Sequence, residues 1–130
     1  MVRNVIGFIT GLVVGFIVVA GIQMINYGMF PLPDGLETSD KEGMLKHIQT
    51  LPPLAYIIVY VAHILGSLLA AVVAVKIADN SKFRISMALG LFFTVVGLVN
   101  IATIPHPLWF SILDTFGYLP AAYLGYRIAN

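Results

Sequence analysis

Two ionisable side chains lie inside long apolar segments of this sequence, and they occupy equivalent places. His63 and Asp114 each stand three residues before a glycine, Gly66 in one case and Gly117 in the other. Ionisable residues in such segments are costly to bury and normally face a partner within the protein. An imidazole and a carboxylate that meet there can share a proton or form an ion pair. We therefore expect His63 and Asp114 to approach each other, either directly or through Asn100.

Four further polar residues stand within or near the ends of the apolar segments and extend the predicted polar cluster. They are Asn100, His106, Gln23 and Asn26. His63 and Asp114 precede a basic residue, Lys76 or Arg127, by the same interval, which covers about 20 Å of helix at 1.5 Å per residue. The two ionisable groups are therefore predicted to lie at equal depth, toward the outer side of a membrane.

This polar cluster has four competing interpretations. It could pin the helices together through hydrogen bonds alone, or it could line a pocket, open to the outside, for a lipid head group or a small ligand. His63 and Asp114 could instead handle a proton or an ion. The fourth interpretation is a metal or haem site built from His63, Asp114 and His106, but no HxxxH or HxxE spacing supports it. We predict neither a metal nor a cofactor.

The composition places the chain in a membrane. Of its 130 residues, 59% are hydrophobic and 10% are charged, against about 25% charged in a soluble domain. The net charge of +1 argues against a nucleic-acid partner. Without cysteine there is no disulfide, thiol catalysis or iron–sulfur ligation. Because no GxSxG, P-loop, HExxH or GxGxxG motif occurs, we predict a non-enzymatic protein, although a lipid-modifying site assembled across helices stays open.

Apolar runs of about 20 residues are long enough to cross a bilayer as helices. Four such runs are present, over residues of about 5–27, 53–77, 83–104 and 107–128. They predict an all-α integral membrane protein, a bundle of four transmembrane helices that forms a single domain over residues 1–130. Pro120 lies inside the fourth run and is expected to kink that helix.

The segment 28–52 between the first two runs is polar at its start and amphipathic at its end. Ser39 and Glu42 match a capping box with Ser39 as the N-cap, and apolar residues follow at helical spacing. This pattern predicts a short amphipathic helix on the outer membrane surface. It is either a solvated connector or a lid over a site between the helices.

The basic residues are distributed unevenly between the two predicted sides. Five of them precede or follow the apolar runs on one side: Arg3, Lys76, Lys82, Arg84 and Arg127. The other side has Lys41 and Lys46, accompanied by four acidic residues. The positive-inside rule therefore predicts that both termini lie in the cytoplasm.

Small residues recur at every fourth position in the apolar runs, which is typical of closely packed membrane helices. The glycines assigned to helix packing are Gly7, Gly11, Gly15, Gly66, Gly90, Gly117 and Gly125. They can pack the helices of one chain together. Alternatively, the glycines of the first helix join two copies into a homo-oligomer.

An internal repeat relates two of the apolar runs. Residues 66–78, GSLLAAVVAVKIA, match residues 117–129, GYLPAAYLGYRIA, at a constant offset of 51. Two helical hairpins related by a pseudo-two-fold axis along the membrane normal explain this match. A gene duplication and a chance similarity of apolar sequences both remain as origins.

Four stretches carry a resemblance to known proteins. They are IPHPLWF at 104–110, YLPAAYLG at 118–125, FPLPDGLE at 30–37 and AHILGSLLAA at 62–71. Through them the chain resembles a set of uncharacterised small four-helix bacterial membrane proteins. The resemblance implies a location in the bacterial inner membrane, and it implies no activity, cofactor or catalytic residue.

We therefore expect a non-enzymatic membrane protein that acts as an accessory subunit or as a ligand- or lipid-binding module. Its expected partners are membrane lipid and either a larger membrane complex or further copies of itself. The alternative is a small proton- or ion-coupled transporter that uses His63 and Asp114.

Overall fold

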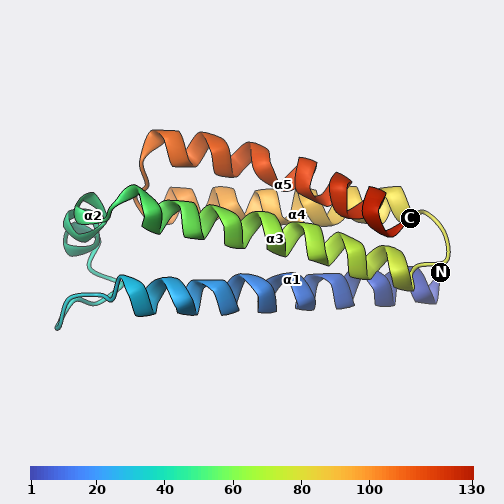
Figure 1. Cartoon of the computed structure of the whole chain (residues 1–130), viewed down its shortest axis with the longest axis horizontal. Coiled ribbons are helices and arrows are strands. Elements are labelled where there is room, and N and C mark those ends of the chain that lie inside the picture. The colour runs from blue at the N-terminus through green and yellow to red at the C-terminus, as the bar shows by residue number, and fades with distance from the viewer.

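The computed structural model describes all 130 residues, which form five α-helices and no β-strand. The helices are α1 (Val2–Met29), α2 (Lys41–Thr50), α3 (Pro53–Ile77), α4 (Lys82–Thr103) and α5 (Leu108–Ala129). The four long helices lie side by side, and α2 lies across one end of them (Figure 1). Both chain termini lie at the opposite end (Figure 1). We call these two ends the α2 end and the terminal end.

Three of the helices, α1, α3 and α4, are long and apolar enough to cross a membrane. The surface agrees with this, because large apolar side chains are exposed along all four long helices. The interior is built from small residues instead, and Ala62, Ala70, Ala71 and Ala74 are fully buried. A soluble protein shows the reverse distribution. These features indicate a membrane protein whose helices associate through close backbone approach.

The helix ends follow from local sequence signals. α3 covers the predicted range 53–77, because Pro53 starts it at a position whose N–H would be unpaired in any case. The ends of the other long helices differ from the predicted ranges by one to three residues. α5 continues through Pro120.

The predicted N-cap of α2 is wrong by one residue. The cap is Asp40, whose carboxylate accepts a hydrogen bond of 3.0 Å from the backbone N–H of Gly43. The Ser39 hydroxyl donates instead to the Glu37 carboxylate at 3.4 Å. A carboxylate is also the better partner for the positive end of the helix dipole, which explains why Asp40 takes this place.

The glycines of α1 face small residues of α3. The facing pairs are Gly7 with Ala74, Gly11 with Ala70, and Gly15 with Gly66. A Cβ atom on Gly11 would lie 2.6 Å from the Ala70 carbonyl oxygen, so the backbones meet without side chains between them. In this chain the three glycines of α1 therefore serve an intramolecular contact.

The second set of small residues joins α5 to its neighbours. Gly117 faces Ile64 and Tyr60 of α3, and a Cβ atom on Gly125 would collide with the Leu68 carbonyl oxygen. Gly90 of α4 faces Ala122 of α5. α3 packs against α1, α4 and α5, whereas α1 and α5 do not pack against each other. α3 is therefore the central helix and positions the polar residues described below.

Candidate functional site

The structure brings His63 of α3 and Asp114 of α5 into direct contact. His63 Nδ1 lies 2.6 Å from Asp114 Oδ1. The Tyr118 hydroxyl, one turn beyond Asp114, donates a hydrogen bond of 2.8 Å to Asp114 Oδ2 and lies 2.9 Å from His63 Nδ1. Asp114 is only 1% exposed and His63 8% exposed. We call these three residues the His63 triad.

The short contact between His63 and Asp114 requires one proton between Nδ1 and Oδ1. The second carboxylate oxygen is occupied by the Tyr118 hydroxyl, so both oxygens of Asp114 have partners. The other imidazole nitrogen, Nε2, makes no hydrogen bond within the protein. A carboxylate at Nδ1 holds the ring in one orientation and leaves Nε2 available to another group. The triad can therefore bind a hydrogen-bonding group or exchange a proton at Nε2.

The triad has this geometry because α3 and α5 run in the same direction at a fixed register. The Ser67 hydroxyl donates to the Tyr118 carbonyl oxygen at 2.9 Å, again between residues 51 positions apart. Matching positions of the two helices thus face each other over one turn. Tyr118 was not among the predicted site residues, although its place four residues after Asp114 puts both on one helix face.

A small cavity lies beside the triad, and we call it the His63 cavity. Its volume is about 150 Å³. It is lined by Phe16, Val19, His63, Phe93, Val96, Gly97, Asn100 and Tyr118. Most of the lining is apolar and comes from α1 and α4, which make the sparsest contact of all packed helix pairs. The cavity therefore lies at the boundary between α1 and α4, the packed helix pair with the least contact. We call this boundary the seam between α1 and α4.

A second cavity, which we call the α2 cavity, lies beneath α2 and has a volume of about 170 Å³. Its polar lining residues are Gln23, Asn26, Tyr27, His47, Tyr56, Asn100 and His106. Four of these belong to the predicted polar cluster, and they come from α1, α4 and the corner between α4 and α5. Asn100 lines both cavities, so it is the lining residue that the α2 cavity and the His63 cavity have in common.

Asn26 carries the one buried side-chain oxygen or nitrogen atom that has no hydrogen-bond partner. This atom is Oδ1, and the residue is 8% exposed. An unpaired acceptor in a buried place costs about 1–3 kcal/mol. A molecule that donates a hydrogen bond to Asn26 within the α2 cavity would remove this cost.

His106 lies apart from the triad, at the corner between α4 and α5. Its Nδ1 donates a hydrogen bond of 2.6 Å to the Ile104 carbonyl oxygen, and its ring stacks on Phe110 at 5.1 Å. Burial lowers the pKa of His106 below its ordinary value, although the bond to Ile104 partly opposes this shift. His106 is therefore neutral at neutral pH, with Nε2 as an acceptor.

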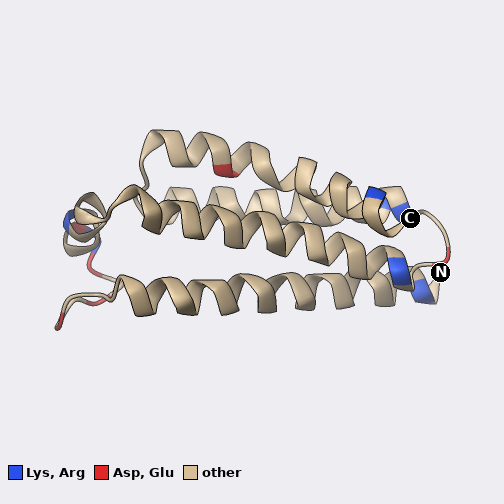
Figure 2. Ribbon diagram, viewed as in Figure 1, with Lys and Arg blue, Asp and Glu red and all other residues tan.

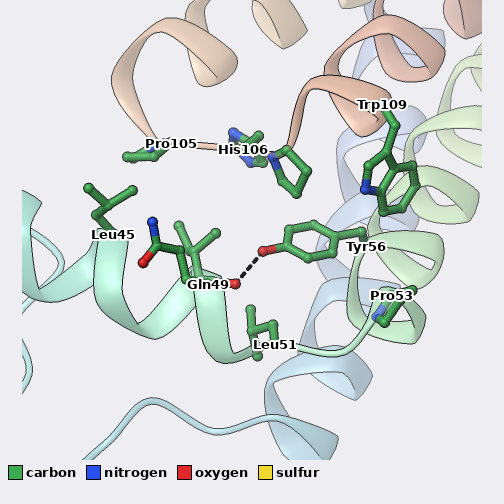
Figure 3. Close-up of a pocket in the computed structure, with 10 residues that line it drawn as sticks. Leu45, Gln49, Leu51, Pro53, Tyr56, Pro105, His106 and Trp109 are labelled. Carbon is green, nitrogen blue, oxygen red and sulfur yellow. Dashed lines mark hydrogen bonds between the residues drawn. The ribbon is translucent and has the colours of Figure 1, made fainter.

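Tyr56 joins α3 to α2. Its hydroxyl donates a hydrogen bond of 2.5 Å to the Ile48 carbonyl oxygen. Figure 3 shows this bond at the wall of a wider, open pocket of about 350 Å³, which Leu45, Pro105 and Trp109 also line. Tyr56 lies on the same helix face as His63, seven residues earlier, which is the signal that could have identified it from the sequence.

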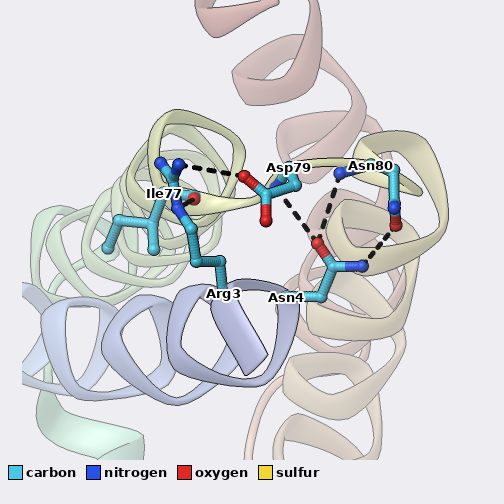
Figure 4. Close-up of polar contacts among 5 residues, drawn as sticks. All are labelled: Arg3, Asn4, Ile77, Asp79 and Asn80. Atoms are coloured by element: carbon cyan, nitrogen blue, oxygen red, sulfur yellow. Dashed lines mark hydrogen bonds and ion pairs between the residues drawn. The ribbon is translucent and has the colours of Figure 1, made fainter. Parts of the chain in front are cut away.

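The terminal end is held by a separate polar network (Figure 4). Asn4 Oδ1 accepts hydrogen bonds from the backbone N–H groups of Asp79 at 3.1 Å and Asn80 at 3.3 Å. Arg3 donates to the Ile77 carbonyl oxygen at 3.1 Å and pairs with Asp79 at 2.9 Å. These contacts join the start of α1 to the turn between α3 and α4. These contacts stabilise the terminal end, and none of the residues that make them lines the α2 cavity or the His63 cavity.

No group of three His, Asp or Glu side chains lies close enough to hold an ion, because His106 lies at the corner while His63 and Asp114 lie deeper in the helices.

No protein-family model, curated protein or solved structure matches the chain.

Proposed function

We propose that this chain is a non-enzymatic integral membrane protein that binds a lipid or another small amphiphile in the α2 cavity. The observation that carries the proposal is that Asn26, whose Oδ1 atom has no hydrogen-bond partner, is a lining residue of the same cavity as Gln23, Asn100 and His106. A mostly apolar cavity with a few converging polar groups is the usual form of a small-molecule site.

The proposal includes α5 as a fourth transmembrane helix. α5 has 22 residues and packs along α3 and α4, which meets the length required to cross a bilayer of about 30 Å. Asp114 is the acidic residue within it, and its contact with His63 offsets the cost of burying a charge.

The proposed location is the bacterial inner membrane, with both termini in the cytoplasm. Figure 2 supports this orientation, because the basic residues of the long helices gather at the terminal end and most acidic residues gather around α2. The positive-inside rule assigns the terminal end to the cytoplasm. The α2 cavity would then face the outside, with α2 as its cover.

We also propose that the two halves of the chain are pseudo-symmetric hairpins. The contacts between His63 and Asp114 and between Ser67 and Tyr118 support this, because both join residues 51 positions apart. A two-fold axis between α3 and α5 brings equivalent residues together in this way. The halves also differ, since α3 packs against α4 while α1 does not pack against α5.

Co-purification tests the proposed binding. The protein is extracted from membranes in a mild detergent, and bound small molecules are identified by mass spectrometry. Val59 lines the cavity, so Val59→Phe is expected to fill it and to remove the bound molecule. Ile57 is exposed on the same helix, and Ile57→Phe serves as the matched control. Equal ligand content in all three proteins would reject the α2 cavity as the site.

Proton- or ion-coupled transport is a second candidate function. It is favoured by the free Nε2 of His63 and by Asn100, which lines both cavities and so offers a path from α2 to the triad. Asp114→Asn should abolish flux into liposomes while the helices stay folded. Unchanged flux in that variant would exclude the triad as the transport site.

A further inference from the structure

The lining of the α2 cavity contains no Lys, Arg, Asp or Glu side chain. The basic residues of the lining are His47 and His106, so an ionised head group in this place would lose its water without gaining a permanent counter-charge, which costs several kcal/mol. The cavity therefore selects against phosphate, carboxylate and ammonium groups. Its ligand is neutral at the end that enters the cavity.

The hydrogen-bonding atoms of the cavity lining include acceptors that need a donor group on the ligand. Asn26 Oδ1 is an acceptor without a partner. His106 uses its Nδ1–H on the Ile104 carbonyl oxygen, which leaves Nε2 as a second acceptor in the neutral ring. The side chains of Gln23 and Asn100 make no hydrogen bond within the protein and can accept or donate. A ligand with O–H groups satisfies all four residues, whereas an ether or ester does not.

The size of the cavity limits the head group. A cavity of about 150 Å³ holds a molecule the size of benzene, and the α2 cavity has about 170 Å³. The head group that fits therefore has about six non-hydrogen atoms, as glycerol does.

The neighbouring cavity indicates where the rest of the ligand lies. The His63 cavity shares Asn100 with the α2 cavity and continues along the seam between α1 and α4. Two of its lining residues, Phe16 and Val96, are partly exposed on the apolar surface. An acyl chain attached to the head group can leave the α2 cavity past Asn100 and follow this seam. The arrangement favours a lipid over a free polyol.

We infer that the α2 cavity binds an uncharged lipid whose head group carries free hydroxyl groups, with its acyl chain along the seam between α1 and α4. This rests on the proposed function and names the ligand class for the same site. Asn26 and His106 accept hydrogen bonds from the hydroxyl groups, and Asn100 marks the boundary between head group and chain.

The test uses the purified chain in lauryldimethylamine oxide, a detergent without hydroxyl groups, and counts bound molecules by native mass spectrometry. Three probes are compared: 1-monooleoylglycerol, methyl oleate, which has the same chain without a donor, and free glycerol. We expect 1-monooleoylglycerol to bind about tenfold more tightly than methyl oleate, the ratio that one hydrogen bond of 1.4 kcal/mol provides. Glycerol alone is expected to bind too weakly to be detected.

Two variants assign the binding to the cavity. Asn26→Leu keeps the approximate volume of the side chain and removes the acceptor, so its affinity for 1-monooleoylglycerol should fall to that for methyl oleate. Gln49 lies outside the α2 cavity, in the wider pocket, and Gln49→Leu should bind both lipids as the wild type does. Circular dichroism and thermal unfolding establish that both variants are folded, and His106→Phe replaces Asn26→Leu if the latter is not.

The outcomes separate this inference from the proposed function. If both lipids bind equally well and Val59→Phe weakens both, the cavity binds amphiphiles but does not select hydroxyl groups, and the inference is wrong. If glycerol binds as tightly as 1-monooleoylglycerol, the ligand is a free polyol and the lipid assignment is wrong. If Val59→Phe changes no binding, the proposed function fails as well.

Discussion

His63 Nδ1 and Asp114 Oδ1 lie 2.6 Å apart, on two helices that run in the same direction. The contact joins α3 to α5 through the least exposed ionisable group of the chain, since Asp114 is 1% exposed. Tyr118 closes the arrangement by donating to the second carboxylate oxygen at 2.8 Å. Asp114 and Tyr118 therefore have different expected effects when their side chains are removed.

Asp114→Ala is expected to lower the free energy of unfolding by about 3–5 kcal/mol, because it leaves His63 buried without its partner. Tyr118→Phe removes one hydrogen bond and should lower it by about 1 kcal/mol. Both values are measured by denaturant titration of the purified protein in detergent micelles. A change of less than about 0.5 kcal/mol for Asp114→Ala would contradict a stabilising role for the pair.

Gly11 and Gly21 of α1 should respond in opposite directions to the same substitution. A Cβ atom on Gly11 would lie 2.6 Å from the Ala70 carbonyl oxygen, whereas one on Gly21 would meet nothing within 4 Å. Gly11→Ala should destabilise the protein by about 1–3 kcal/mol through overpacking. Gly21→Ala should stabilise it by about 0.5–1 kcal/mol, since alanine loses less conformational entropy in a helix. Thermal unfolding in micelles measures both, and equal shifts would refute the α1–α3 contact.

Tyr56→Phe should release α2 without unfolding the long helices. The variant loses the hydrogen bond from Tyr56 to the Ile48 carbonyl oxygen, which contributes about 1 kcal/mol, or about fivefold in an opening equilibrium. The rate of hydrogen–deuterium exchange at the amides of residues 41–51 should therefore increase about fivefold. Tyr60 makes no hydrogen bond through its hydroxyl, so Tyr60→Phe is the control and should leave this exchange unchanged.

His106 should make the stability of the folded protein depend on pH. Burial lowers the pKa of His106 in the folded state. As the pH falls, His106 is therefore protonated at a higher pH in the unfolded state than in the folded state. The stabilising effect of a neutral His106 is complete above the ordinary histidine pKa of about 6.5 and is lost as the pH falls through the lowered value.

Thermal unfolding between about pH 7 and pH 5 measures this effect. The wild type should lose more stability over this range than His106→Gln, because only the wild type has this histidine. All other titratable residues are the same in the two proteins, so the difference between them reports on His106. A His106→Gln variant with the wild-type pH dependence would show that His106 does not cause it.

Much of the local structure could be predicted because its signals are short-range. Pro53 starts α3 and the apolar run that follows continues to Ile77, so the predicted range 53–77 coincides with the helix. The proximity of His63 and Asp114 could be predicted because both stand at the same place in a repeated pattern. The predicted N-cap of α2 is wrong because Ser39 and Asp40 are adjacent and both residue types suit an N-cap. The geometry of the turn, together with the helix dipole, decides that Asp40 reaches Gly43.

Other parts of the site could not be predicted from residue type. Tyr118 and Tyr56 are two of six tyrosines in the chain, and their hydrogen bonds depend on how α3 and α5 are rotated about their axes. The division of the polar residues also depends on packing. Gln23, Asn26 and His106 line the α2 cavity, and Asn100 lines both cavities. His63 and Asp114 belong to the triad instead.

By itself, the sequence determined the all-helical class, the apolar character that suits a membrane and the equal level of His63 and Asp114 along their helices. Those properties follow from composition and from spacing along the chain. Only the tertiary structure decided that the glycines of α1 face α3 and that Asn26 Oδ1 is left without a donor. The contacts of the α1 glycines and of Asn26 both depend on how helices that are distant in sequence are rotated and aligned against each other. A small rotation of one helix about its axis would give these residues different neighbours.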